Sequence, residues 1–178
     1  MRIYGNRQLK TLPGETTRPT TGRVREALFN IWQGAIADSR WLDLCAGNGS
    51  IGAEALCRGA REVVGIEQLK NACAIIEENW RKMAQAGQHF QVIQGNILSQ
   101  LPKLQGQVFD RIYFDPPYAS ELYDPVLSAI ADFQLLHPQG EIAAEYSRQF
   151  WKPIEIPQLS LSRTKHYGHS SLAFYQVK

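Results

Sequence analysis

The sequence has few of the residues that would indicate a disulfide-stapled or metal-bound fold. Its 178 residues include only three cysteines and four histidines. Cys45, Cys57 and Cys73 show no Cys-x-x-Cys spacing, so we expect reduced core thiols rather than a zinc cluster or a disulfide framework. His166 and His169 have the spacing of metal ligands but no third ligand nearby, and we therefore expect no metal.

Long apolar runs are also missing. No run approaches the roughly 18 apolar residues that a membrane span needs, and the first residues do not form an apolar signal segment. We therefore expect a cytoplasmic protein without a membrane partner. With 44% hydrophobic residues, the chain can bury a sizeable core. We expect a monomer with one domain, residues 1–178, in which residues 1–36 form an N-terminal extension and helix and residues 40–178 form the core.

The net charge is only +2, but it is unevenly distributed. Residues 1–25 hold six basic residues and one acidic residue, a charge of +5, so the remaining 13 basic and 16 acidic residues carry −3. A basic arm on a mildly acidic body is typical of a protein that brings a polyanion to its surface. A solvated polar terminus would have the same composition, so this feature alone leaves a nucleic-acid partner open. The candidate contacts are Arg7, Lys10, Arg18, Arg23 and Arg25.

Strand and helix patterns alternate along most of the chain. After a β-prone start in RIYGNRQL, apolar residues recur at helical spacing from Val24 to Ala35, and Thr20 or Thr21 can cap that helix. Strands are predicted in WLDLC (41–45), EVVGIE (62–67), FQVIQG (90–95), VFDRIYFD (108–115) and EIAAEY (141–146). Helices are predicted around 51–58, 69–86 and 123–133. This order indicates an α/β fold with a doubly wound, mostly parallel sheet, to which LSLSRTKHYG and SLAFYQVK add a C-terminal antiparallel hairpin.

A glycine-rich turn follows the first of these strands. It contains Gly47-x-Gly49-x-x-Gly52, and Glu67 comes twenty residues after Gly47, at the end of the next strand. This pattern fits a dinucleotide, whose ribose hydroxyls would bind the acid, and it fits S-adenosylmethionine equally well. Asp43 favours the second ligand, because an acid there would repel a pyrophosphate and attract a cationic methionine group. A solvated or helix-capping Asp43 is the alternative.

The stretch YFDPPYAS places Asp115 at the carboxyl end of a strand, on the edge of the sheet where ligands bind. Pro116 and Pro117 could simply stiffen a turn. They would also fix a rigid pair of acceptors, since Asp115 and the Pro116 carbonyl can hold the two hydrogens of an exocyclic amine. Tyr118 offers an aromatic face on which a flipped base can stack.

The Asp-Pro-Pro-Tyr sequence resembles the motif of S-adenosylmethionine-dependent amino methyltransferases that act on nucleic-acid bases and on glutamine. The wider sequence is similar to the RsmD family, bacterial 16S rRNA (guanine-N2)-methyltransferases, from about Leu9 to Val177. The stretches that carry this similarity are TRPTTGRVREALFNIW, LDLCAGNGSIGAEALCRGA, FDPPYASELYDPVL and KHYGHSSLAFY.

The resemblance implies a Rossmann-like class I methyltransferase with a seven-stranded sheet, S-adenosylmethionine as methyl donor, and 16S rRNA or an assembling small subunit as partner. The implied cofactor contacts are Asp43, Ala46, Gly47, Asn48, Gly49, Glu67, Gln68, Asn96 and Ile97. The implied catalytic turn is Asp115, Pro116, Pro117 and Tyr118. The basic segment from Arg18 to Arg25 would face RNA, and Lys165 and Tyr167 would add RNA contacts unless they only form an exposed hairpin tip.

Two departures from the family and three alternatives remain. The stretch before Arg7 is shorter and less basic than that of the family, so the affinity for RNA can differ from that of the family. Asn96 stands where Asp is more usual, although its side chain can also pair with adenine. The first alternative function is a nicotinamide-dependent oxidoreductase using the literal glycine pattern. The second is a non-catalytic RNA-binding module. The third is another nucleic-acid base amino-methyltransferase, which acts on a different rRNA guanine or on adenine N6; an adenine-N6 DNA enzyme usually has a large target-recognition insert that would be hard to fit into 178 residues.

Overall fold

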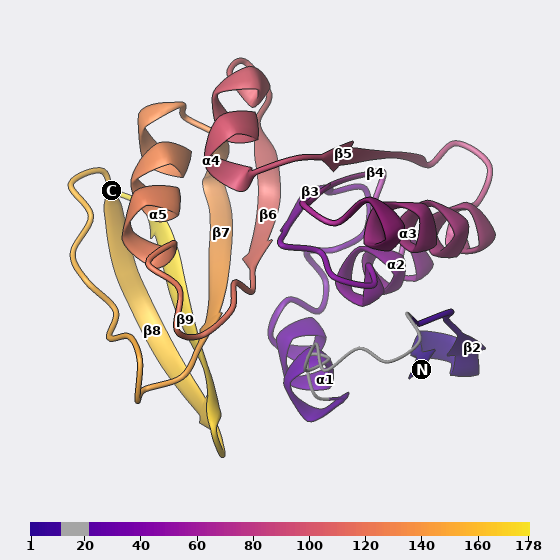
Figure 1. Cartoon of the computed structure of the whole chain (residues 1–178), viewed down its shortest axis with the longest axis horizontal. Coiled ribbons are helices and arrows are strands. Elements are labelled where there is room, and N and C mark those ends of the chain that lie inside the picture. Colours follow the sequence, from indigo (N-terminus) through magenta and orange to yellow (C-terminus); the bar gives the residue numbers. More distant parts are fainter. Residues whose placement is uncertain (12–21) are drawn as a thin grey trace.

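The computed structural model describes residues 1–11 and 22–178, and these residues build a seven-stranded sheet with helices on both faces (Figure 1). The strands lie in the order β5-β4-β3-β6-β7-β9-β8. The first five in sequence pair in parallel, and β9 is antiparallel to both β7 and β8. Their bounds are β3 Arg40–Leu44, β4 Glu62–Glu67, β5 His89–Gln94, β6 Phe109–Phe114, β7 Leu136–Tyr146, β8 Leu159–Tyr167 and β9 Ser170–Val177. The predicted doubly wound sheet with its C-terminal hairpin is confirmed.

Two hydrophobic layers cover the sheet. Side chains alternate along each strand, so Trp41, Val63 and Tyr113 face one layer, whereas Leu42 and Val64 face the other. The first layer contains α1 Gly22–Ile31, α2 Ser50–Cys57 and α3 Lys70–Met83. The second contains α4 Ile97–Gln100, the 3-10 helix η2 Leu101–Leu104 and α5 Tyr123–Asp132. No helix in the described ranges is long and apolar enough to cross a membrane.

Several element bounds differ from the predicted ones for local reasons. The first helix ends at Ile31, although apolar spacing continues to Ala35, because the chain turns directly after it and Gly34 adopts a positive φ angle there. The third helix ends at Met83 because Ala84 has an extended backbone. The short helices α4 and η2 were not predicted, since a four-residue helix carries no useful periodicity. The predicted caps Thr20 and Thr21 lie outside the described residues.

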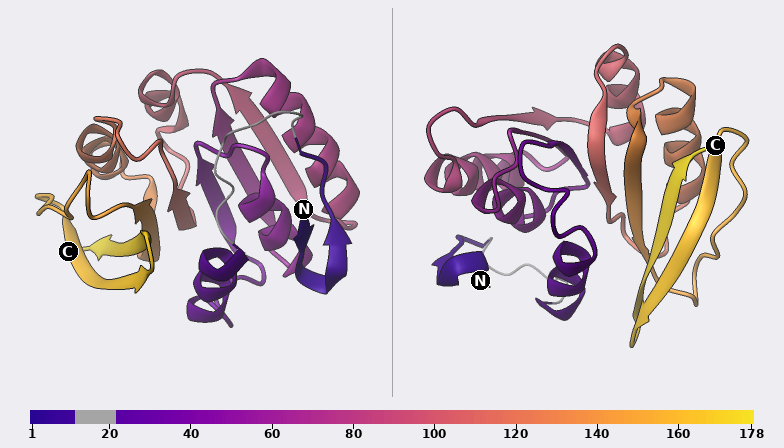
Figure 2. Two further views of the ribbon diagram at one scale, coloured as in Figure 1. Left: turned by 60° about the horizontal axis from the view of Figure 1, so that its bottom comes forward. Right: turned by 180° about the vertical axis from the view of Figure 1, so that it is seen from behind.

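The N-terminal extension packs against the first layer rather than standing apart from it. Strands β1 Arg2–Ile3 and β2 Arg7–Gln8 pair antiparallel around the 3-10 turn η1 Tyr4–Asn6, and the pair lies beside α2 and α3 (Figure 2). Beyond β2, the buried Asn79 side chain of α3 accepts a hydrogen bond from the Lys10 N–H (2.9 Å) and donates one to the Lys10 carbonyl (3.0 Å). The same amide donates to the carbonyl of Asn48 in the glycine-rich turn (3.0 Å). The Asn79 side chain therefore links the extension to the glycine-rich turn that precedes α2.

Arg25 corrects one sequence prediction. The residue is buried at 8% exposure, and its Nε lies 2.8 Å from a carboxylate oxygen of Glu54 in an ion pair. Its Nη2 donates to the Arg2 carbonyl (2.8 Å), and Glu54 is paired on its other oxygen with Arg58 (2.8 Å). The prediction that Arg25 contacts RNA is wrong, because its guanidinium stabilises the contact between the N-terminal extension, α1 and α2.

Candidate active site

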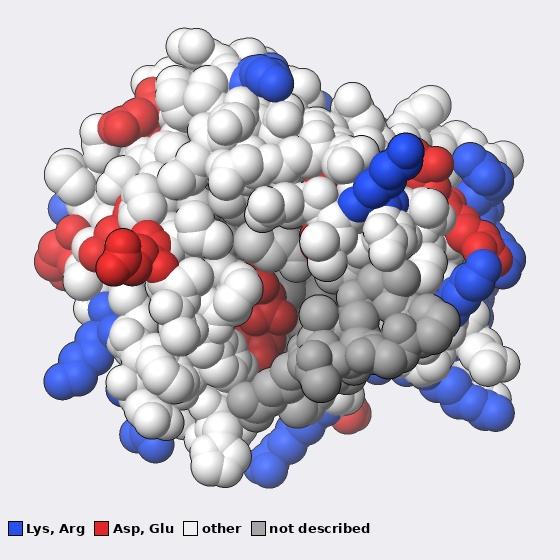
Figure 3. Space-filling view, viewed as in Figure 1, with Lys and Arg blue, Asp and Glu red and all other residues white. Residues whose placement is uncertain are grey.

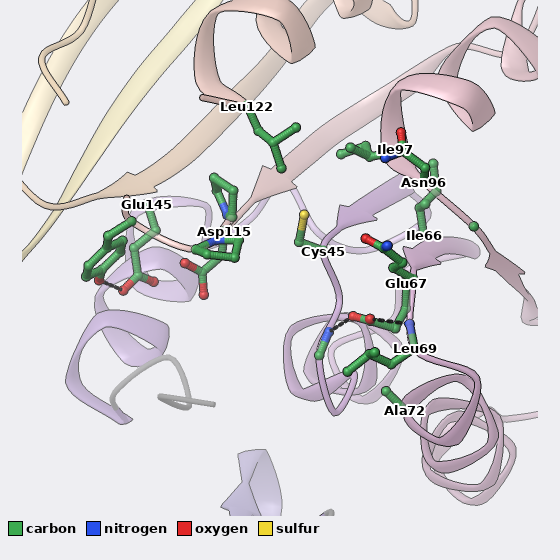
Figure 4. Close-up of a pocket in the computed structure, with 16 residues that line it drawn as sticks. Cys45, Ile66, Glu67, Leu69, Ala72, Asn96, Ile97, Asp115, Leu122 and Glu145 are labelled. Carbon is green, nitrogen blue, oxygen red and sulfur yellow. Dashed lines mark hydrogen bonds between the residues drawn. The ribbon is translucent and has the colours of Figure 1, made fainter. Parts of the chain in front are cut away.

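A pocket of about 680 Å³ opens at the carboxyl edge of the parallel strands. This size is suited to a small-molecule ligand. Figure 4 shows two groups of side chains in the pocket, with Cys45 between them. One group follows β4 and β5 and includes Glu67 and Asn96. The other follows β6 and lies at the end of β7, and includes Asp115 and Glu145. The pocket therefore has two ends, supplied by strands on either side of β3.

Glu67 organises the first end of the pocket. One carboxylate oxygen accepts a hydrogen bond from the Gly47 N–H (2.9 Å), and the other accepts one from the Leu69 N–H (2.9 Å). Gly47 lies at φ +57°, and a Cβ at this position would meet no atom within 4 Å. The backbone of this turn is thus exposed to the pocket, beside a carboxylate whose orientation is already fixed. This arrangement suits a ligand that carries a ribose diol.

The other two glycines of the pattern make room for a tryptophan. Trp80 of α3 is fully buried, and its Nε1 donates to the Gly49 carbonyl (2.7 Å). A Cβ on Gly49 would lie 2.8 Å from that nitrogen, and a Cβ on Gly52 would collide with the same ring. Gly65 in β4 meets the indole as well. Of the three glycines in the pattern, only Gly47 lines the pocket, because Gly49 and Gly52 serve the packing of α3.

Asp43 lies beneath the glycine-rich turn and does not line the pocket. Its side chain is 1% exposed, and its carboxylate accepts a hydrogen bond from the Gly52 N–H (3.0 Å). Burial raises the pKa of Asp43 to about 8, and the nearby charge of Glu67 adds to this shift. The predicted direct attraction between Asp43 and a cationic ligand is therefore corrected. The structure places Asp43 under the start of α2, where it supports the turn.

The remaining predicted cofactor contacts divide into two sets. Gln68, Asn96 and Ile97 line the pocket, whereas Ala46 and Asn48 do not. Asn96 caps α4, since its Oδ1 accepts a hydrogen bond from the Leu98 N–H (3.0 Å). Asp and Asn are both good helix caps, so either residue can hold this backbone in place. The Asn48 side chain likewise accepts from the Ser50 N–H (3.1 Å) at the start of α2.

Asp115 to Tyr118 all line the second end of the pocket. The turn starts where β6 ends, and the Asp115 N–H donates to the carbonyl of Leu44 at the end of β3 (3.3 Å). The Tyr118 hydroxyl donates to Glu145 (2.8 Å) and lies 2.7 Å from the Ser170 hydroxyl. Burial and the charge of Glu145 raise the pKa of Tyr118. Tyr118 is therefore a neutral phenol in a fixed orientation.

Glu145 is a site residue that the sequence analysis missed. It was assigned only to the strand EIAAEY, although its position near the carboxyl end of that strand could have identified it. It is 2% exposed, lines the pocket, and also accepts a hydrogen bond from the Tyr113 hydroxyl. The other lining residues missed were Cys45, Ile66, Leu69, Ala72, Gly95 and Leu122.

The charge in the pocket has one sign. Glu67, Asp115 and Glu145 are the charged side chains among the described lining residues, and none of those lining residues is Lys, Arg or His. Burial, together with the charges of Glu67 and Asp115, raises the pKa of the Cys45 thiol between the two ends. In Figure 3 red carboxylates lie in the hollow of this face, and blue side chains lie around it. Such a pocket favours a cationic ligand over a pyrophosphate.

None of the predicted RNA contacts that the structure describes lines the pocket. Arg23 and Lys165 are exposed, while Tyr167 is half-buried and packs against the first layer. Arg7 and Lys10 are exposed as well; the Arg7 guanidinium contacts the Cys57 sulfur (3.0 Å), and Lys10 pairs with Glu78 (2.7 Å). Arg18 lies outside the described residues.

Comparison with known proteins gives consistent matches over almost the whole chain. The model of the family described as conserved hypothetical protein 95 matches residues 1–176. Ribosomal RNA small subunit methyltransferase D of Haemophilus influenzae is 32% identical over 98% of this chain and 90% of its own length. The Escherichia coli protein of the same name is 31% identical over 99% and 89%. The solved structure of yhhF from Escherichia coli superposes with a TM-score of 0.86 at 31% identity, covering 100% of this chain and 98% of that chain.

Proposed function

The chain belongs to the RsmD family, whose family model is the one described as conserved hypothetical protein 95, and from this membership we propose how its pocket works. It is an S-adenosylmethionine-dependent rRNA methyltransferase. Its reaction transfers a methyl group to the exocyclic N2 amine of a guanine in 16S rRNA. The observation that carries this function is the meeting of two parts in one acidic pocket: a glycine-rich turn held by Glu67, and the Asp-Pro-Pro-Tyr turn.

The end of the pocket around Glu67 fits the methyl donor. Glu67 would bind the ribose hydroxyls, Gly47 would allow close approach of the ligand, and Asn96 with Ile97 would border the adenine. When bound, S-adenosylmethionine would supply a methyl carbon on a sulfonium, whose sulfur would keep the bonding electrons. The acidic lining would attract the positive charge of this donor. The oxidoreductase alternative loses support, because Gly49 and Gly52 serve Trp80 and no described lining residue has a cationic side chain that could neutralise a pyrophosphate.

The other end would hold the acceptor base. Tyr118 stacks on the flipped base, while Asp115 and the Pro116 carbonyl accept the two hydrogens of its exocyclic amine. This orients the nitrogen lone pair toward the methyl carbon. The nitrogen becomes cationic as the new bond forms, and the Asp115 carboxylate stabilises that charge until one proton leaves.

Asp115→Ala tests this assignment. The variant should bind S-adenosylhomocysteine within about threefold of the wild type by titration calorimetry, because Asp115 belongs to the acceptor end. Methyl transfer to 16S rRNA should fall on the order of 10²- to 10³-fold, the usual cost of removing one group that stabilises developing charge. The matched control is Glu121→Ala, which removes an exposed acid four residues after Pro117 and should leave methylation unchanged. Full activity in Asp115→Ala would rule out the proposed mechanism.

The setting of the reaction is proposed from the same family membership. The partner is 16S rRNA or an assembling small subunit in the cytoplasm, and the enzyme acts as a monomer. Arg7, Lys10, Arg18 and Arg23, together with Lys165 and Tyr167, remain the proposed RNA contacts. The modified guanine is identified by mapping 16S rRNA methylation in a strain that lacks the protein and again after complementation.

A further inference from the structure

Glu145 is a buried carboxylate whose polar partners leave it able to bind one more group. Its Oε1 accepts from the Tyr118 hydroxyl at 2.8 Å, and its Oε2 accepts from the Tyr113 hydroxyl. A carboxylate has about four acceptor positions, so these two bonds use only half of them. A buried carboxylate is costly unless it is paired, yet Glu145 forms no ion pair with any Lys or Arg in the described part of the chain. The remaining acceptor positions face a pocket.

The position of Glu145 relates it to the acceptor base. It lies at the end of the pocket formed by the Asp-Pro-Pro-Tyr turn, and Figure 4 shows its carboxyl group at the same end as that of Asp115. The ring of Tyr118 is held by hydrogen bonds to Glu145 and Ser170. A base stacked on this ring would present its polar edge to these carboxylates.

We propose, resting on the function proposed above, that Glu145 reads the Watson–Crick edge of the target base and selects guanine. Guanine carries adjacent donors at N1 and N2, so Glu145 would accept the N1–H while Asp115 and the Pro116 carbonyl accept the N2 hydrogens. Adenine has an acceptor at N1, which a carboxylate repels. A site built around a substrate N–H discriminates strongly against a base that lacks it, because the buried acceptor is then left unpaired. Glu145 is thus a specificity-determining residue that touches the substrate.

Glu145→Gln, combined with two RNA substrates, tests the proposal. One RNA carries guanine at the target position and the other carries 2-aminopurine, which keeps the N2 amine but has no hydrogen on N1. The wild type should prefer guanine in kcat/KM by about 10- to 100-fold, the range of one well-formed base contact. Gln can donate its amide hydrogen to N1 of 2-aminopurine, so in the variant this preference should fall by at least about tenfold. The missing O6 of 2-aminopurine affects both enzymes and cancels in the comparison.

Tyr113→Phe provides the matched control. It removes one hydroxyl from Glu145 but leaves the carboxylate, so its preference for guanine should equal that of the wild type. S-adenosylhomocysteine binding and thermal melting should show that Glu145→Gln is folded. An unchanged preference in Glu145→Gln overturns the proposal, as does an equal loss of preference in Tyr113→Phe. If the wild type methylates no guanine in 16S rRNA, the proposed function itself fails; guanine methylation with an unchanged preference in the variant refutes only the role of Glu145.

Discussion

Asp43 shows how burial changes what one acidic residue does. A carboxylate at the end of a central strand would ordinarily be available to a ligand at that edge. Here α2 begins directly above it, and the Gly52 N–H is its hydrogen-bond donor at 3.0 Å. Because water is excluded, burial raises the pKa of Asp43 to about 8. The protonation of Asp43 therefore makes the stability of the fold around the glycine-rich turn depend on pH.

The pH dependence of stability follows from that shift. In the unfolded chain the pKa of an Asp is about 4, so between about pH 4 and pH 8 the folded protein retains a proton that the unfolded chain releases. The contribution of Asp43 to stability is therefore greatest below about pH 4 and is lost as the pH rises toward 8. Asn cannot titrate, and its Oδ1 can still accept from the Gly52 N–H.

Asp43→Asn should consequently gain free energy of unfolding relative to the wild type as the pH rises. The difference between the two proteins should grow by about 1–3 kcal/mol between pH 5 and pH 7 in urea unfolding. The control is Asp38→Asn, because the Asp38 side chain is 82% exposed and its positive φ also suits Asn. Its difference from the wild type should not change with pH. Parallel curves for Asp43→Asn and the wild type would contradict the assignment.

At the scale of elements, Trp80 joins α3 to the glycine-rich turn, α2 and β4. Its indole lies against Gly49, Gly52 and Gly65, one from each of these elements. A methyl group added at Gly52 would collide with the ring. The geometry of the glycine-rich turn thus depends on how closely α2 approaches α3.

Gly52→Ala should destabilise the protein by about 1–3 kcal/mol, the usual cost of overpacking a core. The reason is steric, since Gly52 lies in α2 without a positive φ and Ala is otherwise the better helix former. The matched control is Gly22→Ala in the first turn of α1, where a Cβ would meet nothing within 4 Å. Denaturant unfolding of both variants measures the difference. Equal stability of the two variants would show that the indole contact does not limit the approach of α2 to α3.

The same elements show which parts of the structure are predictable from sequence. The succession of strands and helices along the chain and the ends of β4 follow from local signals, namely apolar alternation and the turn residues after each strand. The positions of Gly47, Glu67 and Asp115 follow from one further rule, that ligands bind at the carboxyl edge of a parallel sheet. These signals lie within a few residues of the features they predict.

Other features depend on partners that are distant in the sequence. Gly49 and Trp80 are 31 residues apart, and no residue near the glycine pattern predicts that the indole packs against it. Arg25 and Glu54 are 29 residues apart, so the sequence could not distinguish this buried cation from its exposed neighbour Arg23. The burial of Glu145 and its tyrosine partners could not be predicted either, because an acidic residue in a strand indicates neither. Burial is a property of the packed layers, and local patterns report it only indirectly.

At the scale of the whole molecule, the basic N-terminal region has two different tasks. Arg25 forms a buried ion pair with Glu54 and holds the extension against α2, whereas Arg23, two residues earlier on α1, is exposed. Only an exposed cation can release counterions from RNA when it binds. The charge of +5 on residues 1–25 therefore overstates what is available to a polyanion.

Arg23→Ala and Arg25→Ala should separate these tasks. Arg23→Ala should weaken RNA binding and reduce the slope of log K against log salt by about 0.7–0.9, while its stability stays within about 0.5 kcal/mol of the wild type. Arg25→Ala should keep the wild-type slope but lose about 1–3 kcal/mol of stability, since Arg58 would be the one remaining ion-pair partner of Glu54 among the described residues. Filter binding over a salt series and urea unfolding give both quantities. An unchanged slope in Arg23→Ala would contradict a contact between RNA and this side of α1. A reduced slope in a folded Arg25→Ala would contradict the purely structural role assigned to Arg25.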